Sequence, residues 1–516
     1  MCPALRKCAL LLSSVLLSAC ASAGSVSVSA ADTSDKVVRI LLVNDVYVTD
    51  TLRNGRGGLA RVVALRDSIE RATSSRVLFM LAGDVLSPSV LGKLYQGAQM
   101  VDAFNVGRLD YAAIGNHEFD LPRAQLLARL QESRFRWMTA NCLDATTDKP
   151  FPGVRGWDTV TVNGVKLGMF STTVLAPYSS YVRCYSPDSA TGPLVDTLVR
   201  EGVDIVMGFT HRYIHEDSAT LETEPRITAI IGGHEHDGRR EIVNGKLLIK
   251  AQSNVRTAAL VTFEQAGGVW RTRDTSFAIG PGMREDPATK RVVDKWNDSL
   301  VKRIGPDRVI GTAHEAIDAA DSTSRRGESR FGNMIADALR HGTGADVALI
   351  NSGALRFDDV IQPGPITTHI LEAIFLFADE TRALTFPLSG ARLRAVLENG
   401  IRRGGLGSGP YPQVSGVRFS FDARRDSGSR IVGDLTREDG SVIRPTDTLQ
   451  VTFVTYPVCL GGDGYRIPEA AAVCAELSGD PASKPRSVDL VIQHLTAMNG
   501  TIVQPPLGRV TRLDRH

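Results

Sequence analysis

The sequence predicts an α/β protein with two domains. The chain has 516 residues, which is more than one hydrophobic core usually spans. In its first half, apolar runs typical of buried strands alternate with segments of helical spacing. A polar residue follows each of these strands, and ligands of α/β sheets bind at the carboxyl ends of strands. We therefore expect a functional site at that edge of the sheet.

Five predicted strands of the first half end in polar side chains. The strands cover residues 37–43, 76–82, 111–114, 203–209 and 227–231. The residues that follow them are Asp45, Asp84, Asn116 with His117, His211, and His234 with His236. Each one alone is more simply a turn former, a helix cap or a structural histidine. Five successive strand ends of this kind are improbable by chance, and they indicate one shared site.

The residue types at these strand ends predict a pair of metal ions. Carboxylate and amide oxygens mixed with imidazoles suit divalent Zn, Mn, Co or Fe, whereas a single structural zinc favours thiolates. Two ions about 3.5–4 Å apart need a bridging carboxylate, and Asp84 is the natural bridge. Such a pair polarises a phosphoryl oxygen and creates a hydroxide at neutral pH.

The first residues are separate from the fold. Arg6 and Lys7 precede the apolar residues 9–17, and small residues lead to Cys20. Residues 1–19 are typical of a secretory signal and too short for a transmembrane helix. Their end resembles the lipobox of bacterial lipoproteins, which predicts a lipid anchor on Cys20, with cleavage without a lipid as the alternative. Either way we expect export to the periplasm or cell surface, with residues 20–35 as a flexible tether.

The charge balance excludes a large electrostatic surface. Lys and Arg number 59 against 57 Asp and Glu, and the predicted signal carries two of the basic residues and no acid. The mature chain is therefore close to neutral and has no electrostatic footprint for a nucleic acid polymer or an anionic membrane. Any phosphate binding has to be local.

Four of the seven cysteines lie beyond Cys20, at Cys142, Cys184, Cys459 and Cys474. In an oxidising compartment we expect them to form disulfides, and none has the spacing of a zinc site. The simplest pairing joins Cys142 to Cys184 and Cys459 to Cys474, one disulfide in each domain. The sequence alone allows three connectivities.

The strand-end series resembles a known family. Its stretches are Asn44-Asp45, Gly83-Asp84, Gly115-Asn116-His117-Glu118-Phe119-Asp120, Thr210-His211 and Gly233-His234-Glu235-His236. They are similar to those of the calcineurin-like metallophosphoesterases, and in particular of the 5'-nucleotidase family, which includes bacterial periplasmic nucleotidase/UDP-sugar hydrolases and ecto-5'-nucleotidase. The resemblance implies an α/β fold with an N-terminal four-layer αββα metallophosphoesterase domain (residues 36–280), a linker helix (281–306) and a C-terminal α/β substrate-binding domain (307–516).

The same resemblance implies a role for each strand-end residue. The implied ligands are Asp45 and His236 for one metal, Asp84 for the bridge, and Asn116, His211 and His234 for the other metal. His117 and Asp120 would be the catalytic pair. Glu118, between them, receives no role.

One residue departs from the family pattern. The family usually has Asp-x-His at the first strand end, whereas this chain has Asp45-Val46-Tyr47. Tyr47 could ligate as a phenolate, leave its place to water, or weaken the first metal site. A subset of relatives carries the same Asn-Asp-Val-Tyr form, so we interpret Tyr47 as the mark of a subfamily.

In the C-terminal half the resemblance implies a nucleoside-binding site. Matching motifs place Arg325, Asn351 and Arg356 near the phosphate and ribose, Asp463 on the ribose, and Phe377 on one face of the base. The second stacking aromatic of the family is missing, because Pro457 stands at its place. Tyr456 beside it is the candidate substitute, since stacking needs an aromatic face and not a particular ring.

Together these observations predict an exported dinuclear-metal phosphoesterase that hydrolyses nucleoside 5'-monophosphates or related nucleotides. Within the same class, a 2',3'-cyclic-nucleotide phosphodiesterase or a UDP-sugar pyrophosphatase is the alternative. A non-catalytic nucleotide-binding surface lipoprotein is the alternative from another class, if Tyr47 empties one metal site. The sequence does not predict base preference, the physiological metal or oligomeric state.

Overall fold

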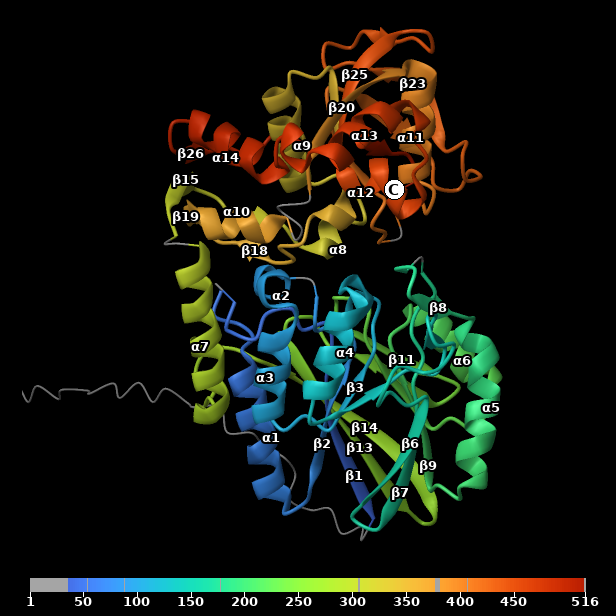
Figure 1. Cartoon of the computed structure of the whole chain (residues 1–516). Coiled ribbons are helices and arrows are strands. Elements are labelled where there is room, and N and C mark those ends of the chain that lie inside the picture. The colour runs from blue at the N-terminus through green and yellow to red at the C-terminus, as the bar shows by residue number, and fades with distance from the viewer. Residues whose placement is uncertain are drawn as a thin grey trace, which may run out of the picture.

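The computed structural model describes residues 36–514 apart from residues 53, 88, 177, 305–306, 376–380 and 406. The predicted signal peptide, the tether with Cys20, and Phe377 lie outside the described residues. Figure 1 shows an N-terminal body in blue and green and a C-terminal body in yellow to red, joined through α7 (Pro287–Ile304). None of the helices in this described part has both the length and the apolar composition needed to cross a membrane.

The N-terminal body contains two six-stranded sheets. The first has the order β14-β13-β1-β2-β3-β4. Its strands are β1 (Val37–Val43), β2 (Val77–Ala82), β3 (Tyr111–Ala113), β4 (Arg136–Met138), β13 (Thr257–Ala266) and β14 (Val269–Ala278). The second has the order β11-β12-β10-β9-β7-β6. Its strands are β6 (Trp157–Val162), β7 (Val165–Phe170), β9 (Ile205–Thr210), β10 (Ala229–Gly232), β11 (Arg239–Val243) and β12 (Lys246–Lys250).

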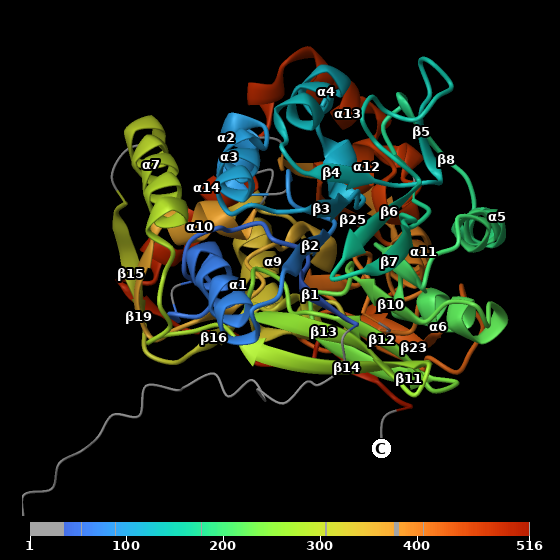
Figure 2. The ribbon, with the colours of Figure 1, turned by 90° about the horizontal axis from the view of Figure 1, so that it is seen from below.

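Helices cover the outer faces of both sheets. They are α1 (Leu59–Thr73), α2 (Val90–Tyr95), α3 (Ala98–Val106) and α4 (Arg123–Glu132) on one side, and α5 (Pro187–Arg200) and α6 (Ile214–Thr223) on the other. Along β1, Leu41 and Val43 pack among residues of α1 and α3, whereas Ile40 and Leu42 pack against the second sheet. Alternate side chains thus fill two cores, which explains why both faces of the strand are apolar. The four-layer αββα arrangement expected for this domain is confirmed, as Figure 2 shows.

Parallel pairing gathers the polar strand ends. β1, β2 and β3 run parallel to one another in the first sheet, as do β9 and β10 in the second. The carboxyl ends of parallel strands lie at the same edge of a sheet. In Figure 1 the C-terminal body lies over one end of both sheets.

The C-terminal body is a smaller α/β unit with a single core. Its central sheet has the order β20-β25-β17-β21, formed by β17 (Val347–Asn351), β20 (Ala383–Ser389), β21 (Pro412–Ser415) and β25 (Thr448–Val454). The other strands described in this body are β15 (Val309–Ala313), β16 (Ile317–Asp318), β18 (Val360–Ile361), β19 (Gly364–Thr367), β22 (Arg418–Phe421), β23 (Ile431–Thr436), β24 (Val442–Ile443), β26 (Thr501–Ile502) and β27 (Val510–Arg512). Its helices are α8 (Asp321–Ser324), α9 (Arg330–Thr343), α10 (Thr368–Ile374), α11 (Gly390–Gly400), α12 (Thr455–Cys459), α13 (Ala471–Gly479) and α14 (Ser487–Ala497).

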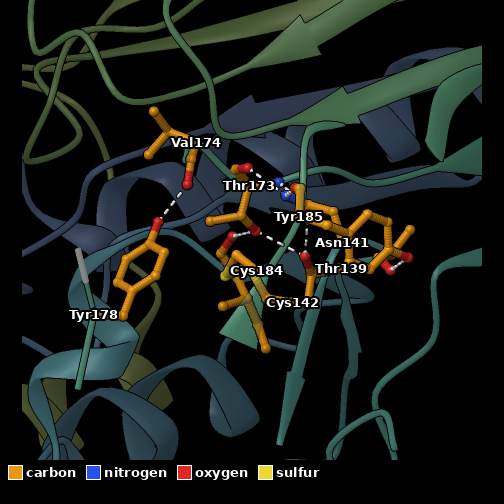
Figure 3. Close-up of a disulfide and its surroundings, with 10 residues drawn as sticks. Thr139, Asn141, Cys142, Thr173, Val174, Tyr178, Cys184 and Tyr185 are labelled. Carbon is orange, nitrogen blue, oxygen red and sulfur yellow. Dashed lines mark hydrogen bonds between the residues drawn. A yellow bond between two sulfur atoms is a disulfide. The ribbon is translucent and has the colours of Figure 1, made fainter. Parts of the chain in front are cut away.

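Both predicted disulfides are present, Cys142–Cys184 and Cys459–Cys474. The first joins β5 (Cys142–Asp144) to β8 (Val182–Cys184) beside a buried polar network that Figure 3 shows. In this network the Asn141 amide donates to the Thr173 carbonyl at 2.9 Å and accepts from the Thr173 N–H at 2.8 Å. The next N–H, of Val174, donates to the backbone carbonyl of His211 at 2.7 Å. The disulfide-linked segment therefore supports the backbone of a predicted metal ligand.

Candidate active site

The backbone at the strand ends is tightly folded. Asp45, Asp84 and His234 have positive φ values of 51°, 56° and 86°. Non-glycine residues rarely adopt this region, and where they do it often marks a functional site. Gly115 makes the close approach possible, because a Cβ atom there would lie 2.1 Å from Oδ1 of Asp84. Glycine is therefore required where the third strand end meets the second.

One group of donor atoms surrounds the hydroxyl of Tyr47. This oxygen lies 3.3 Å from Asp45 Oδ1, 3.3 Å from Asp84 Oδ2 and 3.0 Å from His236 Nε2. Asp45 Oδ1 and His236 Nε2 are 3.6 Å apart. The Tyr47 oxygen is thus the common neighbour of these three side chains, and Tyr47 stands where the family usually has histidine.

A second group shares Asp84 with the first, since the same Asp84 oxygen, Oδ2, contacts both Tyr47 and His211. The ligand atoms of Asp84, His211 and His234 are all within 4.8 Å of one another. His211 Nδ1 donates to the Ala82 carbonyl at 2.8 Å, so its Nε2 faces Asp84 Oδ2 at 3.1 Å. This contact is close but does not have hydrogen-bond geometry, and the buried Nε2 has no hydrogen-bond partner. The Asn116 side-chain oxygen completes the group, 3.1 Å from His234 Nδ1.

The pKa values of the two histidines in the second group shift in opposite directions. Burial opposes charge on His211, but Asp84 and Asp45 raise its pKa to about 9. Burial also opposes charge on Asp84, yet His211 and His117 hold the pKa of this carboxyl well below its usual range. Burial together with the neighbouring His211 lowers the pKa of His234. Since metal ligands bind in their deprotonated form, a cation here would replace protons on the imidazoles.

Glu118, to which the sequence assigned no role, holds the strand ends together. The side chain is fully buried. One carboxylate oxygen accepts from the N–H groups of Val85 and Leu86 at 2.7 and 3.0 Å, and the other from those of Gly115 and Asp84 at 2.7 and 3.0 Å. Burial, and next the charge of Asp84, raise the pKa of Glu118 to about 6. Glu118 thus links the second strand end to the third.

A buried lysine supports the loop of His234 and His236 in a similar way. Lys250 Nζ lies 2.7 Å from Glu235 Oε2 and 3.1 Å from Asp217 Oδ2. The other oxygen of Glu235 accepts from the Ile214 N–H at 2.6 Å. Sequence reasoning missed this network, although the acid between two histidines in Gly233-His234-Glu235-His236 was a signal for it.

His117 and Asp120 form a hydrogen-bonded pair in a short 3-10 turn (His117–Asp120), where a loop was expected. His117 Nδ1 lies 2.6 Å from Asp120 Oδ2, which also accepts from the Ser87 hydroxyl at 3.1 Å. His117 Nε2 faces the C-terminal body, 3.4 Å from Arg356 Nη1. The ring therefore contacts a carboxylate of its own turn at one nitrogen and an arginine of the C-terminal body at the other.

The residues predicted in the C-terminal half lie around the same region. Arg356 reaches His117, and Arg325 pairs at 2.6 Å with Asp321, a neighbour of His236. Asn351 Nδ2 donates to Asp463 Oδ2 at 2.7 Å. A cleft of about 730 Å³ between the two bodies is lined by residues of both, among them His234, His236, Asp321, Arg325 and Gly409.

This fold and site define a metal-dependent phosphoesterase of the αββα class. Two family models match the chain, "Calcineurin-like phosphoesterase" over residues 38–238 and "5'-nucleotidase, C-terminal domain" over residues 309–470. The protein belongs to this 5'-nucleotidase family and is a hydrolase of phosphoric esters.

Three relatives illustrate the similarity. Protein 5NUC of Lutzomyia longipalpis is 25% identical over 511 residues, which cover 89% of this chain and 87% of that protein. Snake venom 5'-nucleotidase of Naja atra is 25% identical over 460 residues, covering 79% and 85%. The crystal structure of a 5'-nucleotidase precursor from Thermus thermophilus matches with a TM-score of 0.80 at 24% identity, covering 93% of this chain and all of that one.

Proposed function

We propose that this protein hydrolyses nucleoside 5'-monophosphates to nucleoside and phosphate outside the cytoplasm. The observation that carries the proposal is the position of the His117–Asp120 pair. The donor groups lie on one side of this pair, and the C-terminal residues predicted to bind substrate lie on the other. Asp84 contacts the pair through the His117 N–H at 2.8 Å, and Arg356 contacts it from the other domain. A phosphoester placed there meets the donor groups, a proton donor and an arginine together.

The donor set fits two divalent cations. Asp45, Asp84, His236 and Tyr47 would hold one, and Asp84, Asn116, His211 and His234 the other. The buried Nε2 of His211, which lacks a hydrogen-bond partner, is an observation that supports this assignment. When bound, such a pair lowers the pKa of water and neutralises charge on the phosphoryl oxygens.

His117 would protonate the leaving oxygen of the nucleoside. With Nδ1–H donating to Asp120, the ring takes up a second proton at Nε2, and the carboxylate stabilises the resulting imidazolium. Nε2 is the nitrogen that faces the C-terminal domain, from which the nucleoside would come. Arg356 would bind the phosphate group, orient it, and neutralise part of its charge.

The nucleoside would lie beside α12 and the loop of Asp463, which pack against each other. Asn351 fixes the Asp463 carboxylate, which would accept from the ribose hydroxyls. The Tyr456 ring lies against Gly462, where a Cβ atom would come within 2.2 Å of it, so the ring is placed beside Asp463. Tyr456 is half exposed and would supply one stacking face.

Export is supported by the two disulfides, since these bonds persist in oxidising compartments. We propose that residues 1–19 are removed and that Cys20 carries a lipid anchor in a bacterial membrane. Mass spectrometry of the mature N-terminus checks this directly, because a diacylated Cys20 and an unmodified terminus differ in mass.

The function is tested on purified protein supplied with Mn or Zn. We expect about two bound ions per chain by elemental analysis and release of phosphate from AMP. Faster turnover of a 2',3'-cyclic nucleotide or UDP-glucose would replace the proposed substrate with one of the alternatives. Zero or one ion, with no release from any of these substrates, would support the non-catalytic binding protein instead.

A further inference from the structure

A loop of the C-terminal domain reaches into the metal-ligand region of the N-terminal domain. It covers residues 355–359, between the turn Ser352–Ala354 and β18. Three of its side chains contact the other domain. They are Arg356 on His117, Asp358 on His236, and Asp359 on Asn54, whose amide donates to both Asp359 oxygens at 3.1 Å.

Asp358 is the most heavily bonded of the three. Its Oδ2 accepts from the Ser253 hydroxyl at 2.8 Å and lies 3.4 Å from Arg256 Nη1, and Arg256 also donates to its backbone carbonyl. Its Oδ1 accepts from the Asp321 N–H at 3.0 Å. The residue is buried and has a positive φ of 47°. Four interactions thus hold a backbone conformation that is rare for a non-glycine residue.

The same carboxylate lies 3.2 Å from Nδ1 of His236. On the opposite side of that ring, Nε2 faces the hydroxyl of Tyr47 at 3.0 Å and Asp45 at 3.6 Å. Asp321 also lies 3.2 Å from Nδ1, but it is paired with Arg325 at 2.6 Å. Neither contact with Nδ1 has the geometry of an aligned hydrogen bond, and the nitrogen lies between the two carboxylates. A metal-ligating histidine is commonly oriented by a carboxylate at its other ring nitrogen.

We propose that Asp358 of the C-terminal domain is the positioning residue of His236, so that docking of the two domains completes the first metal site. Domain docking and metal affinity are then linked, and the linkage is reciprocal: docking tightens the first site, and metal in that site favours docking. The ligands of both sites belong to the N-terminal domain, but the contact of Asp358 is with His236 of the first site, so we expect the second site to be independent of docking. This inference rests on the proposed metal sites.

The test compares Asp358→Ala with Asp359→Asn in the full-length protein. Asp359 is the adjacent residue and also bonds across the interface, but it lies on Asn54 and not on a metal ligand. Calorimetric titration with Mn should show one of two sites weakened about 10- to 100-fold in Asp358→Ala, with the other unchanged. In Asp359→Asn both sites should stay within about twofold of the wild type.

Two further measurements distinguish a specific loss of the first metal site from general destabilisation. Electron paramagnetic resonance of the Mn-loaded protein should change from a coupled pair to an isolated ion in Asp358→Ala at limiting metal, a signature that general destabilisation does not produce. Hydrogen exchange of residues 355–359 should slow on adding Mn to the wild type and not to the variant. Asp358→Asn, which keeps the side-chain volume, replaces the alanine variant if the latter does not fold, and we expect weakening in the same site.

Equal affinity of both sites in the wild type and Asp358→Ala would overturn the inference. So would equal weakening of both sites, or a third ion that depends on Asp358, which would place a cation among His236, Asp321 and Asp358. If the wild type binds two ions and releases phosphate from AMP while the variant binds them unchanged, only the inference fails. If the wild type binds no ion, the proposed function fails as well.

Discussion

The two halves of the active site are built in different ways. In the N-terminal domain, the donor atoms follow the carboxyl ends of strands that are parallel to one another within each sheet. Buried groups such as Glu118 and Lys250 hold the loops that carry these donors. In the C-terminal domain, Arg356 and Asp463 lie on two loops that are far apart in the sequence. Neither loop directly follows a strand. The proposed donor atoms all belong to the N-terminal domain, whereas the C-terminal residues, Asp358 beside His236 among them, reach this half only through the interface. We therefore expect changes of the donor residues to affect metal and rate, and changes of Arg356 and Asp463 to affect substrate affinity.

The largest effect is expected for Asp84→Ala. Asp84 contacts members of both donor groups, His211 at 3.1 Å and Tyr47 at 3.3 Å, so its loss removes a ligand from each. Metal content should fall below one ion per chain, and kcat/KM for AMP should fall by roughly 10⁴-fold or more. Elemental analysis and phosphate release measure the two quantities. Retention of both ions would show that Asp84 is not the bridge.

His117→Ala should separate rate from metal content. The ring is not part of either donor group, and its Nε2 faces the C-terminal domain. Loss of a general acid typically lowers the rate by about 10²–10⁴-fold, and we expect kcat to fall by this amount while both ions remain bound. The two measurements are the same as for Asp84→Ala. If the two variants lost metal and rate in the same proportion, the roles assigned to them would be wrong.

Asp463→Ala tests the C-terminal half. Removing this carboxylate leaves the Asn351 amide without its 2.7 Å acceptor and takes away a partner for the ribose. We expect KM for AMP to rise about 10- to 100-fold, in line with hydrogen bonds to charged groups, with the metal content unchanged. Asp434→Ala, an exposed position on β23, is the matched control and should leave KM as it is. A fall in metal content would mean that Asp463 acts on the metal sites and not on the substrate alone.

The same difference explains which parts could be predicted from the sequence. Strands such as β1 and β2 are buried on both faces, so they appear in the sequence as nearly continuous apolar runs, and their ends were placed within one residue. The donors after them share an edge because the strands are parallel. Residues that form contacts between the domains have no comparable pattern in the sequence. Asp321 and Asp358 are ordinary acids in the sequence, and their approach to His236 depends on how two separately folded units pack.

Glu118 shows that even a well-defined motif can hide a role. The hexapeptide Gly115–Asp120 was identified, but three of the four backbone groups that Glu118 binds belong to Asp84, Val85 and Leu86, more than thirty positions earlier. A carboxylate that accepts only from backbone N–H groups has no partner side chain that would reveal it. Its position between two strand ends that are expected to touch was the available signal.

Glu118→Gln is expected to have the smallest effect on chemistry and a clear effect on stability. The glutamine side chain keeps one acceptor oxygen, but its NH₂ group takes the place of the second. In the wild type that second oxygen accepts from two backbone N–H groups. Leaving such buried donors unpaired costs about 1–3 kcal/mol. We expect the unfolding free energy of the metal-free protein to fall by that amount in urea titrations, while the metal-loaded variant keeps two ions and most of its rate. An equal loss of stability in Asp463→Ala would contradict the comparison, because Glu118 joins two strand ends of one domain and Asp463 lies on the substrate side of the other.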